Sequence, residues 1–210
     1  MSLYPEAIWE QGPDYKYYDA MNAVFGVVCH SMEGWMAGAR SRLHGSGPLN
    51  QASWHFSITK DGTVYQHYPL EASCWHAGST SANTSLIGIE HEGRAGEPLT
   101  EAQVEASVRL VRWISEWAGW KPERLKNLWE HNEVSASPTA CPSNRIPWEK
   151  YTEEDEVEVR ILSNQSEAVS VALDALGRLS GAIGQQEGQY VGVADGAPAG
   201  YRDVVLRVKA

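Results

Sequence analysis

The chain has 210 residues, and its 42% hydrophobic and 21% charged residues are typical of a folded globular protein. The formal net charge is −10, which argues against nucleic-acid binding through a basic face and against a cationic membrane-binding patch. No apolar run reaches the roughly 20 residues of a membrane-spanning helix, so we expect neither a nucleic-acid partner nor membrane insertion.

Short apolar segments in the first half of the chain predict strands. Residues 24–29 form one such segment, which leads directly into His30, and residues 86–91 form another. Between them, residues 54–59 and 63–68 flank an Asp-Gly pair that tolerates positive φ, which predicts a hairpin.

A long amphipathic helix is predicted to begin after Thr100. Thr100 is a good N-cap residue, and Gln103 stands where a capping box requires it. Apolar residues then recur at helical spacing until Gly119, which is expected to end the helix. Residues 125–130 predict a further short strand that delivers His131. Strands combined with a packed helix place the chain in the α/β class.

The composition of the chain changes after Tyr151. A charged segment, residues 152–160, is interpreted as a bridge. Apolar residues share one helical face over residues 164–183, and two strand-like segments, residues 189–194 and 201–210, predict a β-hairpin.

We therefore divide the chain into residues 1–154, which carry the candidate site, and an accessory C-terminal element, residues 155–210. An apolar helical stripe usually packs into a core or against a second copy. The element is expected to cap the first region or to support self-association, with a homodimer as one outcome.

Three residues form a candidate metal site. His30 lies at the end of an apolar strand, and His131 and Cys141 are joined by a loop-like segment that would let them meet. Imidazole and thiolate are standard zinc ligands, and three protein ligands leave an open position, as in catalytic zinc sites. The alternatives are a core histidine bonded to the backbone and a His–Cys spacing that arises by chance.

Glu90 is the candidate proton shuttle. It lies at the end of the strand 86–91, where partial burial would raise its pKa. Alternation along the strand puts Gly88, Glu90 and Glu92 on one face. The alternative is a solvated carboxylate at a strand edge.

Two Trp-His pairs are candidate substrate-binding residues. Trp54 and His55 lie on the first strand of the predicted hairpin, whereas Trp75 and His76 precede a glycine and resemble a pocket wall. The chain has nine Trp and nine Tyr, and aromatic side chains with a polar group suit surfaces that bind sugars or peptides, although they are also common in cores.

A cysteine peptidase that uses Cys29 beside His30 is a competing hypothesis. Neighbouring residues on a strand point to opposite faces, which places this pair poorly.

In chain order, the strand ending in His30, WHFSITKDGTVYQ, WHAG, SLIGIEHEG, a helix, and EHNEV followed by TACPS resemble the N-acetylmuramoyl-L-alanine amidase family over roughly residues 22–151. The family includes phage endolysins, cell-wall recycling amidases and peptidoglycan recognition proteins. The resemblance implies a mixed central β-sheet flanked by helices, one zinc ion, and cleavage of the amide between N-acetylmuramic acid and L-alanine. It puts His30, His131 and Cys141 on the ligand positions and Glu90 on the position of the general base.

The chain departs from the family pattern at two positions. Trp54 stands where some relatives have a catalytic Tyr, and an indole cannot act as an acid or base. Thr139 stands where others have Lys, so it could donate a hydrogen bond to the oxyanion but supplies no positive charge.

We expect a phage endolysin that acts on peptidoglycan. No signal peptide is seen at the N-terminus, so we expect synthesis in the host cytoplasm and holin-type release to the wall. The alternatives are a recognition module that binds peptidoglycan without cutting it and a bacterial recycling amidase. In any of these settings, residues 155–210 could also bind the wall.

Overall fold

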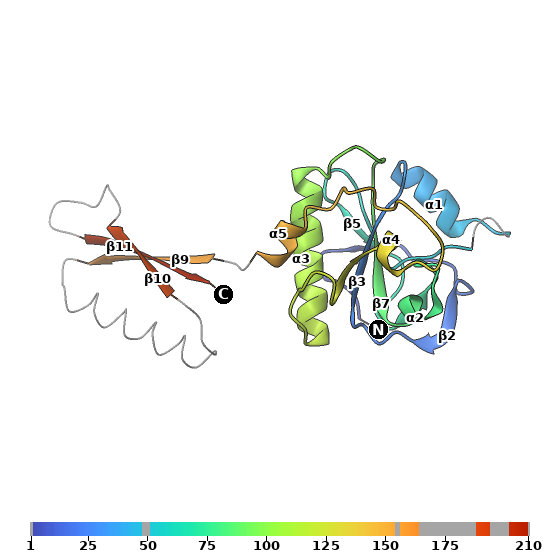
Figure 1. Ribbon diagram of the computed structural model, residues 1–210, viewed down its shortest axis with the longest axis horizontal. Coiled ribbons are helices and arrows are strands. Elements are labelled where there is room, and N and C mark those ends of the chain that lie inside the picture. The colour runs from blue at the N-terminus through green and yellow to red at the C-terminus, as the bar shows by residue number, and fades with distance from the viewer. Residues whose placement is uncertain (1, 48–50, 154–155, 164–187, 194–201, 210) are drawn as a thin grey trace. The chain divides into compact units, whose positions relative to one another are not determined.

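The computed structural model describes residues 2–47 and 51–153, and the strand pairing of residues 156–163, 188–193 and 202–209. The chain divides into two compact units, residues 1–152 and 153–210 (Figure 1).

A mixed six-stranded sheet forms the centre of the first unit, in the order β1-β5-β4-β7-β3-β8. Its strands are β1 (Ile8–Trp9), β3 (Gly26–Ser31), β4 (Phe56–Ile58), β5 (Val64–Gln66), β7 (Leu86–His91) and β8 (Leu128–Glu130). All neighbouring pairs are parallel except β4 with β5, which form the predicted hairpin. A separate antiparallel pair joins β2 (Tyr17–Met21) to β6 (Ala72–Cys74).

Helices cover both faces of this sheet. Figure 1 shows α3 (Glu101–Ala118) along one side, with α1 (Met36–His44), α2 (Thr80–Asn83) and α4 (His131–Val134) on the other. The short helix α5 (Trp148–Thr152) ends the unit. The prediction of a mixed sheet flanked by helices is confirmed.

The helix α3 begins and ends as its sequence predicts. The Thr100 side chain accepts a hydrogen bond from the backbone N–H of Gln103, and the Gln103 side chain accepts one from the backbone N–H of Thr100. Gly119 adopts a left-handed conformation with φ 76°, which a residue without Cβ adopts at no steric cost.

The two faces of the central strands have different neighbours. Val27 and Cys29 of β3 and Ile87 and Ile89 of β7 belong to the core cluster that includes the buried face of α3. Val28 of β3 packs instead in a cluster with residues of the α2 region. Because side chains alternate along a strand, His30 and Glu90 lie on the face away from α3.

The second unit contains an antiparallel sheet in the order β10-β11-β9. The strands β10 (Gly188–Val193) and β11 (Arg202–Lys209) form the predicted hairpin. Interpreting residues 152–160 as a bridge was wrong, because β9 (Glu156–Ser163) runs through this segment and pairs with β11. Alternating Glu and Val in the sequence was the strand signal that the charge obscured. The predicted helix 164–183 lies outside the described residues.

Candidate functional site

Two strands and a loop bring the candidate metal ligands to one edge of the sheet. His30 is the penultimate residue of β3, and His131 directly follows β8, which pairs in parallel with β3. Parallel neighbours end at the same edge, so these two residues meet there. The loop after α4 returns Cys141 to them. One ligand atom from each residue lies within 4.8 Å of the other two.

The contacts of this His-His-Cys cluster leave its ligand atoms facing one another. The Cys141 Sγ lies 4.0 Å from the His30 Nδ1, and the ring centroids of His30 and His131 are 4.6 Å apart. The backbone N–H of Ser31 donates a hydrogen bond to the Cys141 Sγ over 3.2 Å. A donor at this distance stabilises a thiolate, the form of sulfur that binds metal.

Burial controls the protonation of the cluster. It lowers the pKa of His30 well below the ordinary value, with a further decrease from the neighbouring histidines, and it also lowers the pKa of His131. Both rings are therefore neutral near pH 7, with one nitrogen lone pair each. Burial also raises the pKa of the Cys141 thiol to about 12, and a bound cation would reverse that effect.

Glu90 lies beside the cluster. It pairs in register with His30 across the parallel strands β7 and β3, so the two side chains leave the sheet on the same face. Its Oε2 is buried and has no hydrogen-bond partner among the described residues. Burial raises its pKa to about 7, which is the range in which a carboxyl group can both accept and release a proton at neutral pH.

Thr139 lies two residues before Cys141 and is partly exposed. Its Oγ1 accepts a hydrogen bond from the backbone N–H of Cys141 over 3.2 Å. Because the bond uses the hydroxyl as an acceptor, the Thr139 proton is free to be donated elsewhere.

The structure corrects the prediction that Trp54 and His55 contact substrate. Trp54 is 3% exposed, and its indole N–H donates to Ser57 inside the core. His55 is 0% exposed, and its ring nitrogens contact the Ala72 carbonyl and the Gly88 N–H. Both side chains therefore stabilise the interior.

The second Trp-His pair is close to the His-His-Cys cluster, which His76 contacts. Trp75 is partly exposed and lines a cavity of about 460 Å³ together with Tyr18, Gly78 and Asn83. Trp75 thus remains available to a ligand. His76 is buried, which corrects its prediction as a substrate-binding residue, and its Nδ1 lies 3.1 Å from the Nε2 of His30.

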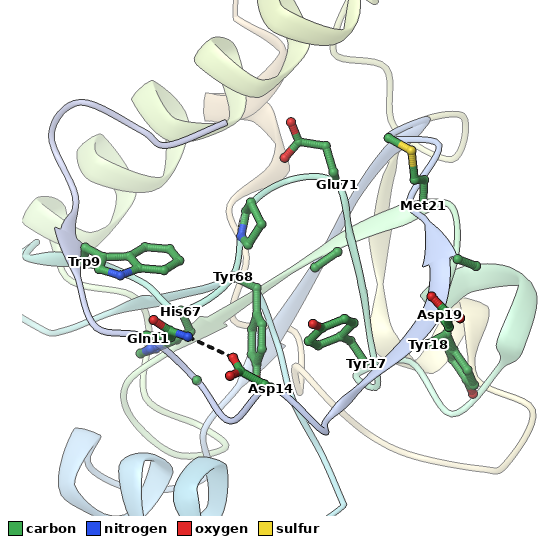
Figure 2. Close-up of a pocket in the computed structure, with 14 residues that line it drawn as sticks. Trp9, Gln11, Asp14, Tyr17, Tyr18, Asp19, Met21, His67, Tyr68 and Glu71 are labelled. Carbon is green, nitrogen blue, oxygen red and sulfur yellow. Dashed lines mark hydrogen bonds between the residues drawn. The ribbon is translucent and has the colours of Figure 1, made fainter. Parts of the chain in front are cut away.

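Sequence reasoning missed Tyr18, which lines the same cavity as Trp75. The rings of the two residues pack together with 5.9 Å between their centroids. Its neighbour Tyr17 packs instead against Tyr68 in another cavity of about 430 Å³. Figure 2 shows this second cavity, with Tyr17 beside Tyr68 and a hydrogen bond from Gln11 to Asp14. None of the His-His-Cys residues lines it.

The fold and the site together define a class, the α/β proteins that carry a candidate metal centre at the carboxyl ends of parallel strands. Among the described residues, no helix is long and apolar enough to cross a membrane.

Comparison with known proteins narrows this class to a family. The model of the N-acetylmuramoyl-L-alanine amidase family matches residues 20–144, and the chain belongs to that family. It is 38% identical over 112 residues to N-acetylmuramoyl-L-alanine amidase A of Achromobacter lyticus, covering 52% of this chain and 61% of that protein. It is 28% identical over 147 residues to the amidase CwlH of Bacillus subtilis, covering 58% of each. The chain thus spans about three fifths of the length of these two relatives.

Solved structures support the fold. An endolysin amidase from Clostridium intestinale has a TM-score of 0.50 at 24% identity, covering 72% of this chain and 95% of that one. A mutant endolysin from Bacillus subtilis has a TM-score of 0.55 at 23% identity, covering 72% and 97%.

Proposed function

We propose that this chain hydrolyses the amide bond between N-acetylmuramic acid and L-alanine in peptidoglycan, with one zinc ion held by His30, His131 and Cys141. The observation that carries the proposal is the meeting of three zinc-type ligand atoms within 4.8 Å, beside Glu90, in a member of this family.

The donor set fits zinc. Atoms bound to one zinc ion at tetrahedral angles lie about 3.3–3.6 Å apart, and the Cys141 Sγ and His30 Nδ1 are already 4.0 Å apart. Two neutral imidazoles and one thiolate leave a fourth position for catalysis. When bound, zinc would supply a Lewis acid that polarises the scissile carbonyl and makes water more acidic.

Glu90 is proposed as the general base and acid. Its carboxylate takes a proton from the attacking water, whose oxygen bonds to the acyl carbon of the lactyl group. The carbon–nitrogen bond then breaks, and Glu90 returns the proton to the nitrogen of L-alanine. The pKa near 7 suits both steps.

Thr139 and Trp75 are proposed to assist this reaction. The free hydroxyl proton of Thr139 would be donated to the oxygen that gains negative charge. Trp75 and the cavity that it lines would bind part of the substrate.

Digestion of purified peptidoglycan with mass analysis of the products tests the proposal. The parent protein should release stem peptides with a new N-terminal L-alanine, whereas Glu90→Ala should release almost none. Chelation should stop the reaction and added zinc should restore it. A zinc-loaded parent that releases no N-terminal alanine would leave only the recognition module, which binds the wall without cutting it.

The biological setting is proposed to be that of a phage endolysin, made in the host cytoplasm and released to the wall through a holin-type pore. A recycling amidase would instead prefer soluble muropeptides. Relative rates on intact sacculi and on soluble muropeptides distinguish the two, and faster cleavage of soluble muropeptides would contradict the endolysin proposal.

Residues 1–154 are proposed as the catalytic domain, and residues 155–210 as an accessory element for wall binding, capping or self-association. Removing residues 155–210 and measuring wall affinity, molecular mass and stability separates these roles. Lost wall affinity indicates binding, a change from the mass of a dimer to that of a monomer indicates a homodimer, and lower stability alone indicates capping.

A further inference from the structure

A buried histidine lies directly behind one of the candidate zinc ligands. We propose that His76 is a positioning residue that holds His30 in a single tautomer and orientation, with the Nδ1 lone pair of His30 directed at the metal position. The inference rests on the proposed zinc site and deepens it, because it concerns how the site is prepared before metal arrives.

The tautomers follow from a chain of hydrogen bonds. The His76 Nε2 lies 3.1 Å from the backbone carbonyl oxygen of Leu86, which can only accept, so this nitrogen carries the proton. The Nδ1 of His76 is therefore unprotonated. It lies 3.1 Å from the His30 Nε2, which must donate to it. The remaining nitrogen of His30, Nδ1, is thus left with a lone pair, and it is the atom that faces the Cys141 Sγ.

The surroundings of His76 prevent it from leaving this position. The backbone N–H groups of His76 and Ala77 both donate to the Oδ1 of Asn83, over 3.1 and 2.7 Å. The Cα of Gly88 lies against the ring, so that a Cβ there would be 2.6 Å from the His76 Cγ. The ring therefore has a fixed place between Gly88 and His30, and glycine is needed at position 88.

The same short segment also holds the second histidine ligand. The backbone of Ala77, the residue after His76, forms a hydrogen bond with the His131 side chain. With one ring nitrogen occupied, His131 has the other for metal. Consecutive residues thus orient both imidazoles, one through a side chain and one through the backbone.

His55 provides a matched control. It is also fully buried, its Nε2 lies 2.7 Å from the Ala72 carbonyl, and its Nδ1 accepts the Gly88 N–H over 3.0 Å. It therefore has the same tautomer as His76, and the two rings are neighbours at 5.9 Å between centroids. The difference lies in the donor: the His55 Nδ1 accepts a hydrogen bond from a backbone N–H, whereas the His76 Nδ1 accepts one from the metal-ligand candidate His30.

The experiment compares zinc affinities of full-length variants by competition with a chelator. His76→Leu removes the acceptor and should weaken zinc binding about 10- to 100-fold, the usual effect of removing a group that orients a ligand. His76→Asn keeps an oxygen where the Nδ1 lies and should restore affinity to within a few-fold of the parent. His55→Leu should lower the melting temperature but leave zinc affinity unchanged.

Equal affinities for His76→Leu and the parent would overturn the proposal, as would equal weakening in all three variants, which would indicate general loss of packing. If His76→Leu does not fold, nitrogen-15 NMR of the histidine rings in the metal-free parent decides the question. Protons on the Nε2 of both His30 and His76 are expected, and a proton on either Nδ1 would contradict the relay. A parent that binds zinc but cuts no peptidoglycan would overturn the proposed function and leave this inference standing.

Discussion

The two Trp-His pairs of this chain have the same side chains and different surroundings. Trp54 and His55 lie in the interior, where every ring N–H or ring nitrogen contacts a core partner. Trp75 borders a cavity, and His76, whose ring lies against Gly88 of β7, contacts a metal-ligand candidate. The second pair is available for function, whereas the first pair stabilises the interior.

His55 and His76 do not differ in protonation state or tautomer. Burial lowers the pKa of His55 to about 4 and that of His76 to about 3, so both rings are neutral at pH 7. Each ring donates to a backbone carbonyl through Nε2 and accepts through Nδ1. What differs is the donor at Nδ1, a backbone N–H in one case and His30 in the other.

The largest effect is expected at the metal edge itself. Cys141→Ser replaces a thiolate with a weak zinc ligand, so bound zinc and amidase activity should fall to background. Cys141 is only partly buried, so the free energy of unfolding of the metal-free protein should change by about 1 kcal/mol or less. Measurements of zinc content, amidase activity and denaturant unfolding check this prediction. Retained activity without bound zinc would contradict the proposal that Cys141 holds a catalytic zinc ion.

Glu90→Gln should have the next largest effect. It removes the proposed proton acceptor and keeps the shape of the side chain, so kcat should fall about 10²- to 10⁴-fold. The zinc affinity should remain within a few-fold of the parent, because Glu90 is not among the three ligands. Steady-state kinetics and metal titration on the same sample check both numbers, and an unchanged kcat would remove Glu90 from the mechanism.

Alanine substitution of the two tryptophans tests the comparison directly. Trp54→Ala should lower the free energy of unfolding by about 3–5 kcal/mol, because it removes a large side chain from the core. Trp75→Ala should lower the free energy of unfolding by only about 1 kcal/mol. Its main effect should be a higher KM, because the residue borders the cavity. Unfolding curves and kinetics are both needed, and equal stability losses would contradict the distinction between the two pairs.

The pH dependence of stability should separate Glu90 from the buried histidines in the metal-free protein. Burial lowers the pKa values of His55, His67 and His76 to about 3–4, so the unfolded chain binds more protons below pH 6.5. These residues therefore make stability rise as the pH increases from about 4 to 6.5.

Glu90 acts in the opposite direction. Its pKa of about 7 exceeds its ordinary value of 4.5, so the folded state holds the extra proton and stability falls as the pH rises between these values. Glu90→Gln should equal the parent near pH 4 and exceed it by roughly 3 kcal/mol at most at pH 8. Chelated samples of both proteins, unfolded in denaturant at each pH, give the difference. A constant difference would mean that Glu90 does not titrate in this range.

The smallest effect is expected from Gly88→Ala, which affects one pair and spares the other. The backbone N–H to His55 remains, whereas the new Cβ crowds the ring of His76. Stability should fall by about 1–3 kcal/mol, the usual effect of overpacking, and zinc binding should weaken. Gly38→Ala is the control, because a Cβ at Gly38 meets nothing within 4 Å. Unchanged zinc binding in Gly88→Ala would argue that His76 is not held by this contact.

Local signals predicted much of the first unit. The capping box at Thr100 and Gln103 and the stop at Gly119 depend on residues close in sequence, and the helix has the bounds they indicate. The segment 152–160 was interpreted wrongly because its charges outweighed its two-residue alternation. In that segment the pairing of β9 with β11, more than 40 residues later, decides the structure.

The sequence by itself determined the helix α3, the strands β3, β7 and β8, the hairpin of β4 and β5, the family, and the residue types able to hold zinc, because these depend on periodicity, caps and ordered motifs within the chain. Only the tertiary structure decided which Trp-His pair reaches the site. Both pairs have the same Trp-His dipeptide, but Trp54 and His55 are buried in the core, whereas His76 contacts His30. Burial and the identity of a hydrogen-bond donor are properties of contacts between distant residues, and for that reason the two pairs could be told apart only in the folded chain.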